Sequence, residues 1–507
     1  MTADICVLVE STYPYVSGGV SNWLHALMSK LPEFTFSVVH IGGRPEPGRQ
    51  PVFHLPDNVV ELRELYIFDP FWAKQRPSGR APSRHMTPAW EQLRDFHEGL
   101  VSGKPHGTTE WMRELGQPEA GGIPSWDLLF APESWDLLVS LCQQRAPSSP
   151  FVNYLWVFRS THFPLFSLLR SSLPRARVYH AVSSGFNGFA GALAKLRTGA
   201  PLILTEHGLS VREREIEISQ SEWISRDENT PFDLGHRFDH FQEWWLNMFR
   251  FMAKTSYDYA DTIITIMGIN QGYQVRDGAS ADKMVIIPNG IDVERFRAPR
   301  QRSAEEPRDD QFTVGYVGRV VAVKDIKTYI RAVQIASTVI PRLTAYIVGP
   351  ATEEPEYLEE CKHLVELLGL SDIVHFTGPA DVRDYYRKID VLVLTSLHEA
   401  QPLVILEANC AGVPVISTEV GACRELLTGI TPEDQALGPS GIITPTLSPQ
   451  EIAQGIIHLW RDPGLRQRMA DAGLARAERF YKEDILYESY RAIYEKYLRM
   501  SPVPAEG

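Results

Sequence analysis

Residues 390–412 read DVLVLTSLHEAQPLVILEANCAG, and this stretch decides the fold class. Its first part, residues 390–395, is a short run rich in valine and leucine, which is typical of a buried parallel strand. Pro402 occupies the position expected for a first helical residue, and Gly412 the position where that helix should end. A buried strand that leads directly into a helix indicates a unit of an α/β sheet.

Two carboxylates occupy distinct places in this unit. Glu399 is expected on the loop between strand and helix, and Glu407 one to two turns inside the helix. Ligands of open α/β sheets bind at the carboxyl ends of the strands, where this loop emerges. Two carboxylates there can accept hydrogen bonds from several hydroxyls, which suits a sugar or a ribose. The spacing is equally compatible with two solvated residues, because acidic side chains are usually exposed.

The composition predicts a globular protein. The chain has 507 residues, 44% hydrophobic and 22% charged, which indicates two or three domains. A net charge of −13 argues against nucleic acid and anionic membrane surfaces as main partners. Five scattered cysteines predict buried free thiols in a reducing compartment. Asp4 interrupts the start and Ile5–Val9 is too short for a secretory signal, so we expect a cytoplasmic protein.

The chain begins with a predicted strand, Ile5–Val9, and a loop that ends in Gly18 and Gly19. A helix with an apolar stripe is predicted from Val20 to Leu31. A Gly-Gly turn at a helix start lets backbone N–H groups approach an anion, although a plain tight turn explains the same residues. Residues 42–177 lack the regular alternation of strand and helix patterns. We therefore expect a large insertion there, whose role the sequence does not reveal.

Alternation resumes with strands at Val178–Ala181 and Pro201–Thr205. His207 follows the second of these, where it either contacts a ligand or is a hydrogen-bonded structural residue. The next run, R-E-R-E, places two arginines either toward an anionic ligand or against their neighbouring glutamates. Residues 238–252 carry aromatic and methionine side chains near helical spacing, for which core packing is favoured over a glycan or membrane platform.

The motif PNGID, Pro288–Asp292, predicts a sharp turn between domains, and residues 297–310 predict a solvated linker. Strands and helices then alternate again, starting with Phe312–Val317. Two Rossmann-like domains that face a cleft are therefore expected. Their bounds are 1–292 for the first and 311–478 for the second, with 479–507 as a helix that crosses back to the first.

Two cations follow the first strand of the second domain. Arg319 and Lys324 precede a helix predicted at 326–336. Cations beside the positive end of a helix dipole are unfavourable unless an anion also binds. A rigid guanidinium fork and an ammonium together suit a diphosphate.

Four motifs in this order resemble those of the retaining family 4 glycosyltransferases, which have the GT-B fold. The motifs are the Gly18-Gly19 loop, the T-x-H of Thr205–His207, the G-R-x4-K of Gly318–Lys324 and the E-x7-E of Glu399–Glu407. Gly349-Pro350 departs from a G-x-G of the family, and Gly421-Ala422 from its paired glycines. The insertion, the T-E-H-G-L-S-x-R-E-R-E run and L-H-E-A-Q-P-L-V-I-L-E-A are similar to PelF-type glycosyltransferases of bacterial Pel exopolysaccharide synthesis.

The resemblance implies transfer of a hexose from a nucleotide sugar, expected to be a UDP-sugar such as UDP-glucose, to a growing glycan. It implies donor binding by Gly18, Gly19, Arg319, Lys324, Glu399, Leu403 and Glu407, and catalytic roles for His207, Arg319, Lys324 and Glu399. Arg319 and Lys324 would hold the diphosphate, Glu407 the ribose, and Glu399 and His207 the donor sugar. No metal and no cofactor beyond the nucleotide sugar are expected. Docking on an inner-membrane export complex is a further implication.

Two other classes of function remain open at this stage. A sugar-nucleotide epimerase of the same fold would use the same nucleotide site without an acceptor. A glycan-binding or scaffold protein would bind the donor weakly and turn nothing over, although the motif residues named above are intact.

Overall fold

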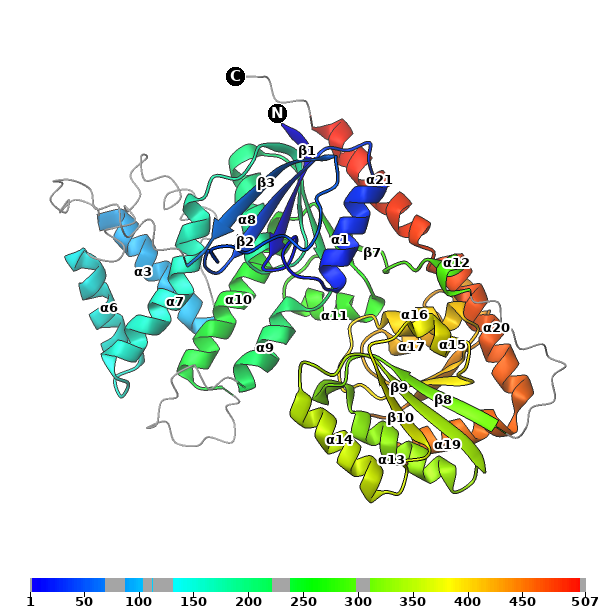
Figure 1. Cartoon of the computed structure of the whole chain (residues 1–507). Helices are drawn as coiled ribbons and strands as arrows, with labels where there is room; N and C mark the ends of the chain where they lie inside the picture. Colours follow the sequence, from blue (N-terminus) through cyan, green and yellow to red (C-terminus); the bar gives the residue numbers. More distant parts are fainter. Residues whose placement is uncertain are drawn as a thin grey trace. The chain divides into compact units, whose positions relative to one another are not determined.

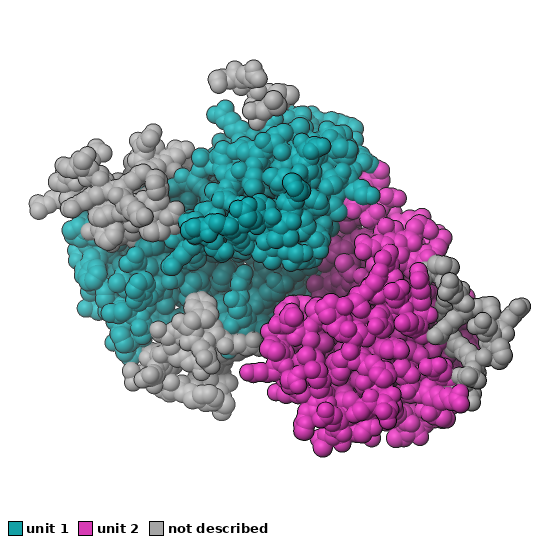
Figure 2. Space-filling view, viewed as in Figure 1, with its two compact units in different colours: residues 1–265, 270–285, 490–507 teal, residues 266–269, 286–489 magenta. Residues whose placement is uncertain are grey.

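The computed structural model describes residues 2–68, 87–103, 112, 131–220, 238–297 and 311–501. The chain divides into two compact units, which Figure 2 shows in different colours. Unit 1 comprises Met1–Thr265, Asn270–Val285 and Tyr490–Gly507, and unit 2 comprises Ile266–Ile269 and Ile286–Ser489. Each unit contains its own sheet (Figure 1), which confirms the prediction of two Rossmann-like domains.

Unit 1 has a seven-stranded sheet in the order β3-β2-β1-β4-β5-β6-β7. Its strands are β1 (Ala3–Glu10), β2 (Phe36–Gly42), β3 (Val59–Tyr66), β4 (Ala176–Ala181), β5 (Leu202–Glu206), β6 (Thr262–Thr265) and β7 (Met284–Ile286). β1 pairs in parallel with both β2 and β4, so the strand order switches direction between β1 and β4. Residues 5–9 of β1 are wholly buried, as an apolar run covered on both faces requires.

The helices of unit 1 pack on this sheet and on one another. They are α1 (Gly19–Lys30), α3 (Thr87–Ser102), α6 (Pro132–Arg145), α7 (Phe151–Arg170), α8 (Phe186–Thr198), α9 (Ser210–Gln220), α10 (His240–Tyr259) and α11 (Gly268–Arg276), whose first two residues group with unit 2. α8 contacts β1, β4 and β5, and α10 contacts α3, α7, α8 and α9. Phe241, Trp244 and Met248 on α10 are at most 1% exposed, which confirms core packing for this aromatic stripe.

The expected insertion, 42–177, contributes more to the sheet than its sequence indicates. It contains β3, which pairs in parallel with β2 at the sheet edge. Sequence reasoning missed this strand because Glu61, Arg63 and Glu64 interrupt its apolar residues, as suits a half-buried edge strand. Residues 69–86, 104–111 and 113–130 of the expected insertion lie outside the described residues.

Unit 2 has a six-stranded sheet in the order β10-β9-β8-β11-β12-β13. Its strands are β8 (Gln311–Val317), β9 (Arg342–Val348), β10 (Val374–Gly378), β11 (Val391–Leu394), β12 (Val415–Thr418) and β13 (Gly441–Thr444). β8 pairs in parallel with β9 and β11, so the direction switches between β8 and β11. The strands predicted at the positions of β8 to β12 are thereby confirmed.

The helices of unit 2 are α12 (Val293–Phe296), α13 (Ile326–Ser337), α14 (Pro355–Leu367), α15 (Val382–Tyr386), α16 (Leu403–Cys410), α17 (Cys423–Thr428), α18 (Pro432–Gln435), α19 (Pro449–Arg461) and α20 (Pro463–Phe480). α13 packs against α14 and α19, and α16 against α17 and α20. α16 begins at Leu403, so Pro402 is its N-cap and not, as predicted, its first residue.

The PNGID turn, placed at the end of the first domain from sequence, groups with unit 2. Its Ile291 donates its N–H to Tyr481 O at 2.7 Å and accepts from Glu483 N at 3.1 Å. A Cβ on Gly290 would lie 2.5 Å from Glu483 Cα, so only glycine fits this close approach. Of the predicted linker, residues 298–310 lie outside the described residues.

The last helix, α21 (Glu483–Met500), groups with unit 1 from Tyr490 onward. Three of its tyrosines bond to the unit 1 sheet. The Tyr494 hydroxyl lies 2.7 Å from His180 Nδ1, that of Tyr490 3.0 Å from Thr205 Oγ1, and that of Tyr497 2.6 Å from Thr262 Oγ1. α21 is therefore anchored into the core of unit 1 by polar contacts.

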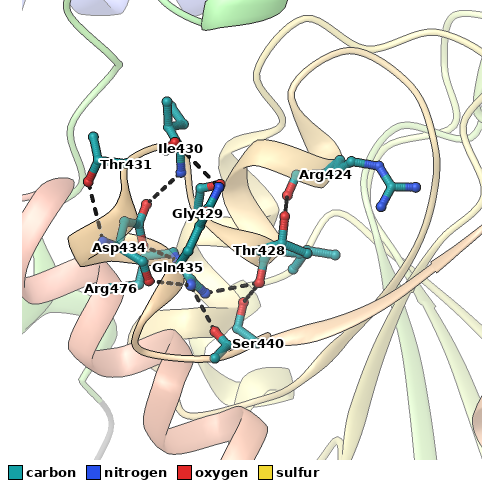
Figure 3. Close-up of polar contacts among 11 residues, drawn as sticks. Arg424, Thr428, Gly429, Ile430, Thr431, Asp434, Gln435, Ser440 and Arg476 are labelled. Carbon is teal, nitrogen blue, oxygen red and sulfur yellow. Dashed lines mark hydrogen bonds and ion pairs between the residues drawn. The ribbon is translucent and has the colours of Figure 1, made fainter.

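Arg476 on α20 holds together a buried network in unit 2 (Figure 3). Its side chain is fully buried and its Nε lies 2.6 Å from Asp434 Oδ1. The other guanidinium nitrogens donate to carbonyl oxygens of Leu427, Asp434 and Gly438 at 2.8–3.2 Å. Because every nitrogen has an acceptor, the charge can be accommodated away from water.

All five cysteines are buried free thiols, as predicted. Across the described ranges, no helix is both long and apolar enough to span a membrane.

Candidate active site

The cation motif and the carboxylate motif of unit 2 meet where the strand order reverses. Lys324 ends a short 3-10 helix after β8, and Glu399 lies on the loop after β11. Lys324 Nζ is 2.5 Å from Glu399 Oε1, and the side chains are only 17% and 10% exposed. Ser396 Oγ also donates to Glu399 Oε1, at 2.6 Å. Both contacts use Oε1 of Glu399. Its other oxygen, Oε2, accepts no hydrogen bond from the residues that the structure describes.

Backbone contacts fix the Glu399 loop on both sides. On one side, Leu397 N donates to Val323 O at 2.8 Å. On the other, Ala422 N donates to Ala400 O at 2.9 Å. Gly421 has φ +50°, and a Cβ there would lie 2.1 Å from Glu399 O, so this position demands glycine. Ala422 itself is accommodated at the position where the sequence departs from paired glycines.

Arg319 lies on the loop after β8 and is 53% exposed. Its guanidinium Nη1 lies 2.6 Å from Glu353 Oε2, and the side chain of Glu353 is exposed to a similar extent. The Arg319 carbonyl accepts from the Tyr316 hydroxyl at 3.0 Å, which fixes the backbone while the side chain is free to reorient. A surface ion pair of this kind is weak and can be exchanged for a ligand anion.

Glu407 lies on α16, as predicted, and its Oε2 accepts from the Tyr386 hydroxyl at 2.8 Å. Burial raises the pKa of the Glu407 carboxyl, whereas the hydrogen bond from Tyr386 and the charge of Arg295 lower it. Leu403 is the first residue of α16 and its side chain is 39% exposed. No side chain among the described residues caps α16, so the N–H groups of Leu403 and Val404 are available to an anion, whereas Ile405 N donates to Pro402 O at 3.1 Å.

Gly18 and Gly19 lie at the start of α1 in unit 1, where Gly18 is the N-cap. A Cβ added to either glycine would meet nothing within 4 Å. Gly18 has φ 178°, which is extended backbone that any residue adopts. The fold of the described residues therefore does not require glycine at either position.

His207 follows β5 and lies against Trp23, one turn into α1, with ring centroids 4.3 Å apart. Burial lowers the pKa of His207 to about 4, so its ring is neutral at pH 7. Two buried ring nitrogens, His207 Nε2 and Trp23 Nε1, have no hydrogen-bond partner among the residues described. Unpaired buried polar groups are uncommon in folded proteins and often mark a functional site.

The structure thus brings the predicted residues together in two groups. Lys324 and Glu399 are in direct contact, and the charge of Glu399 acts on Arg319. Trp23 links His207 to the helix that starts at Gly19. Glu407 and Leu403 lie one turn apart on α16.

Sequence reasoning missed three residues that hold the site: Trp23, Tyr386 and Ser396. Trp23 was assigned only to the apolar stripe of its helix, and no sequence pattern marks the contacts of Tyr386 or Ser396. Of the two arginines in the R-E-R-E run, Arg214 pairs with Glu217 and approaches Glu10, both of which lie outside the run, and Arg212 lies over the ring of Tyr273. The carboxylate of Glu215 within the run pairs with Arg250 instead. No group of three potential metal ligands occurs in the described ranges.

Two sequence families match the chain. The Domain of unknown function (DUF3492) matches residues 3–282, which is more than half of the 507 residues. Glycosyl transferases group 1 matches residues 298–476. The D-inositol 3-phosphate glycosyltransferase of Streptomyces bingchenggensis is 32% identical over 215 residues, 40% of this chain and 46% of that protein. The chain spans about half the length of the first curated relatives that it matches.

Solved structures show the fold. HepE of Anabaena in complex with UDP is 17% identical, with a TM-score of 0.56 over 97% of this chain and 100% of that one. Sucrose-phosphate synthase from Thermosynechococcus elongatus is 18% identical, with a TM-score of 0.58 over 98% and 100%. These likenesses establish the predicted GT-B fold. The chain therefore belongs to the family of the Domain of unknown function (DUF3492), and its residues 298–476 match Glycosyl transferases group 1.

Proposed function

We propose that this protein is a retaining glycosyltransferase that transfers a hexose from a UDP-sugar, such as UDP-glucose, without a metal ion. The observation that carries the proposal is the contact between Lys324 and Glu399 on the loops that follow the neighbouring strands β8 and β11, where the strand order reverses. Ligands of doubly wound sheets bind at this switch point. The UDP complex of HepE supports the choice of nucleotide.

The cations act on the leaving group. On donor binding, Lys324 and Arg319 exchange their carboxylate partners for the diphosphate, and the uncapped start of α16 faces the same charge. Negative charge grows on the diphosphate as the bond to the sugar breaks. Fixed cations and N–H groups stabilise that charge more in the transition state than in the ground state.

The carboxylates and the imidazole act on the sugar and the ribose. Glu399, with its free Oε2, orients hydroxyls of the donor sugar, and Glu407 binds the ribose hydroxyls. His207 is neutral, so it hydrogen-bonds to the sugar without opposing the positive charge that develops on it. Neither glutamate acts as a nucleophile, because the acceptor attacks the same face and the donor phosphate assists its deprotonation.

The similarity to PelF-type enzymes extends the proposal to the acceptor. It supports a growing bacterial exopolysaccharide as acceptor and docking on an inner-membrane export complex. Co-sedimentation of the purified protein with inner membranes that contain that complex, against membranes that lack it, tests the docking.

The nucleotide site is tested by calorimetric titration with UDP, GDP and ADP. We expect UDP to bind selectively. Arg319→Ala and Lys324→Ala should each weaken UDP binding by about tenfold or more, as expected for a charge-assisted hydrogen bond. Arg383→Ala and Lys327→Ala are matched controls, since both remove a cation that pairs with a carboxylate elsewhere in unit 2. Unchanged UDP affinity in both site variants would refute the diphosphate assignment.

Incubation of the protein with the donor separates the remaining classes of function. Glycosylated product that forms only with an acceptor supports the transferase. Isomerised nucleotide sugar in a donor-only reaction would identify an epimerase instead. Weak donor binding with no turnover under either condition would identify a scaffold protein.

A further inference from the structure

Unit 1 contains a cavity of about 370 Å³ that none of the predicted site residues lines. Its walls come from the ends of β1 and β2, the residues after β2 and β3, the start of α8, and helices α7, α9 and α10. Six of its lining residues matter for the argument: Glu10, Phe186, Arg214, Glu217, Trp245 and Phe249. The volume is within the range of small-molecule sites, which begins at about 300 Å³.

The cavity lies at the place where the topology of the sheet predicts a ligand. Glu10 is the last residue of β1, and Phe186 starts the helix after β4. The strand order reverses between these two strands, and crevices beyond the carboxyl ends of strands bind ligands at such points. Unit 2 has its cluster of motif residues at the equivalent position in its own sheet.

The charges of the cavity exclude an anionic ligand. Arg214 pairs with Glu217, and its guanidinium also lies 3.8 Å from Glu10 Oε1. Two carboxylates therefore already surround this cation, so it is not available to a phosphate or carboxylate group of a ligand. A ligand that donates hydrogen bonds from neutral hydroxyls fits this set of acceptors.

Glu10 is held in place by the backbone of the next loop. Its Oε2 accepts from Phe186 N at 3.1 Å, and its side chain is 21% exposed. A Cβ on Gly185 would lie 2.8 Å from the same oxygen, so glycine makes room for the carboxylate. Burial raises the pKa of Glu10, and the charge of Arg214 opposes that shift.

Aromatic rings supply the apolar part of the wall. Trp245 and Phe249 stack one turn apart on α10, with ring centroids 6.1 Å apart and planes at 26°. Phe186 meets Phe249 edge-on at 6.3 Å, and Arg214 lies over the Phe249 ring. Rings beside hydrogen-bond acceptors match a pyranose, which has apolar C–H faces and a rim of hydroxyls.

We propose that this cavity binds a neutral pyranose unit of the acceptor glycan, with the aromatic wall against its C–H face and Glu10 accepting from its hydroxyls. The inference rests on the proposed glycosyl transfer and adds the place where one sugar unit of the acceptor binds. Arg214 positions the carboxylate of Glu10 and does not bind an anion.

The test is saturation-transfer NMR with the methyl glycosides of glucose, galactose, N-acetylglucosamine and N-acetylgalactosamine. Each is added at about 10 mM, because single sugars bind with millimolar affinity at best. We expect at least one glycoside to receive saturation from the wild-type protein, and its signal to fall at least fivefold in Trp245→Ala and in Glu10→Gln. Trp135→Ala, which removes a 52% exposed tryptophan of α6, should leave the signal unchanged.

Trp245 is only 8% exposed, so its truncation can impair folding. Glu10→Gln keeps the shape of the side chain and decides the test if Trp245→Ala does not fold. The absence of any signal from the wild-type protein, or equal signals in wild type and Glu10→Gln, would overturn the inference. UDP titration of the same samples separates the two proposals. Retained UDP binding without glycoside binding rejects only the cavity, whereas absent UDP binding in wild type rejects the proposed function.

Discussion

A buried ring nitrogen without a hydrogen-bond partner is costly, and His207 Nε2 has no partner among the residues that the structure describes. Burial lowers its pKa to about 4, below the value of about 6.5 in an unfolded chain. This difference stabilises the fold above pH 6.5, and the contribution is lost as the pH falls through about 4. Between about pH 6 and 8 the ring is neutral, so it acts through a hydrogen bond and not through a charge.

His207→Gln therefore tests a role that does not depend on titration. Glutamine keeps a hydrogen-bonding group but not its geometry, so we expect turnover to fall by about tenfold. Because His207 is neutral throughout, this factor should be constant from about pH 6 to 8. Turnover of both proteins across this range gives the ratio. A ratio that changes around pH 6.5 would contradict the assignment of a neutral ring.

Gly19 tests whether the start of α1 approaches a ligand. Alanine has open space there and is a better helix former, so Gly19→Ala should leave stability unchanged or raise it by up to about 1 kcal/mol. If a ligand lies against this backbone, the added methyl group should lower donor turnover by about tenfold or more. Thermal unfolding and turnover are measured together.

Gly272→Ala is the matched control for this change, since Gly272 also has open space, on α11. It should leave turnover unaltered and raise stability by up to about 1 kcal/mol, because it also replaces a helical glycine by alanine. Equal turnover in Gly19→Ala and wild type would show that no ligand touches this turn.

At the scale of the element, α20 is held to α17 and α18 by the Arg476 network. Asp434→Ala leaves the Arg476 guanidinium buried without its carboxylate, so we expect a loss of about 3–5 kcal/mol in the free energy of unfolding. Chemical denaturation followed by circular dichroism measures it. Glu360→Ala breaks an exposed pair with Lys327 and should cost less than about 1 kcal/mol. Similar losses in the free energy of unfolding for the two variants would show that the buried pair of Arg476 and Asp434 stabilises the fold no more than an exposed pair does.

At the scale of the whole molecule, ligand binding should be visible as stability. UDP at about one hundred times its dissociation constant should stabilise the folded protein by about 2.7 kcal/mol, because it binds the folded state alone. The shift in melting temperature should persist with EDTA present, since the proposed site uses side-chain cations. Differential scanning fluorimetry with and without EDTA measures this. Loss of the shift in EDTA would show that a metal ion takes part in binding.

The sequence by itself determined the alternation of strands and helices, because apolar runs and Pro–Gly punctuation are local signals. It also placed Lys324, Glu399 and His207 in loops after strands, since each directly follows a predicted strand or its turn. It missed β3, where charged residues hide an edge strand, and it misplaced the start of α16 by one residue.

Only the tertiary structure decided which of these loops meet. The Lys324–Glu399 pair joins residues 75 positions apart, and it depends on β8 lying beside β11. The contact of His207 with Trp23 and the cavity at Glu10 likewise follow from the strand order of unit 1. Strand order is set by long-range packing of the sheet, and no local pattern of residues records it.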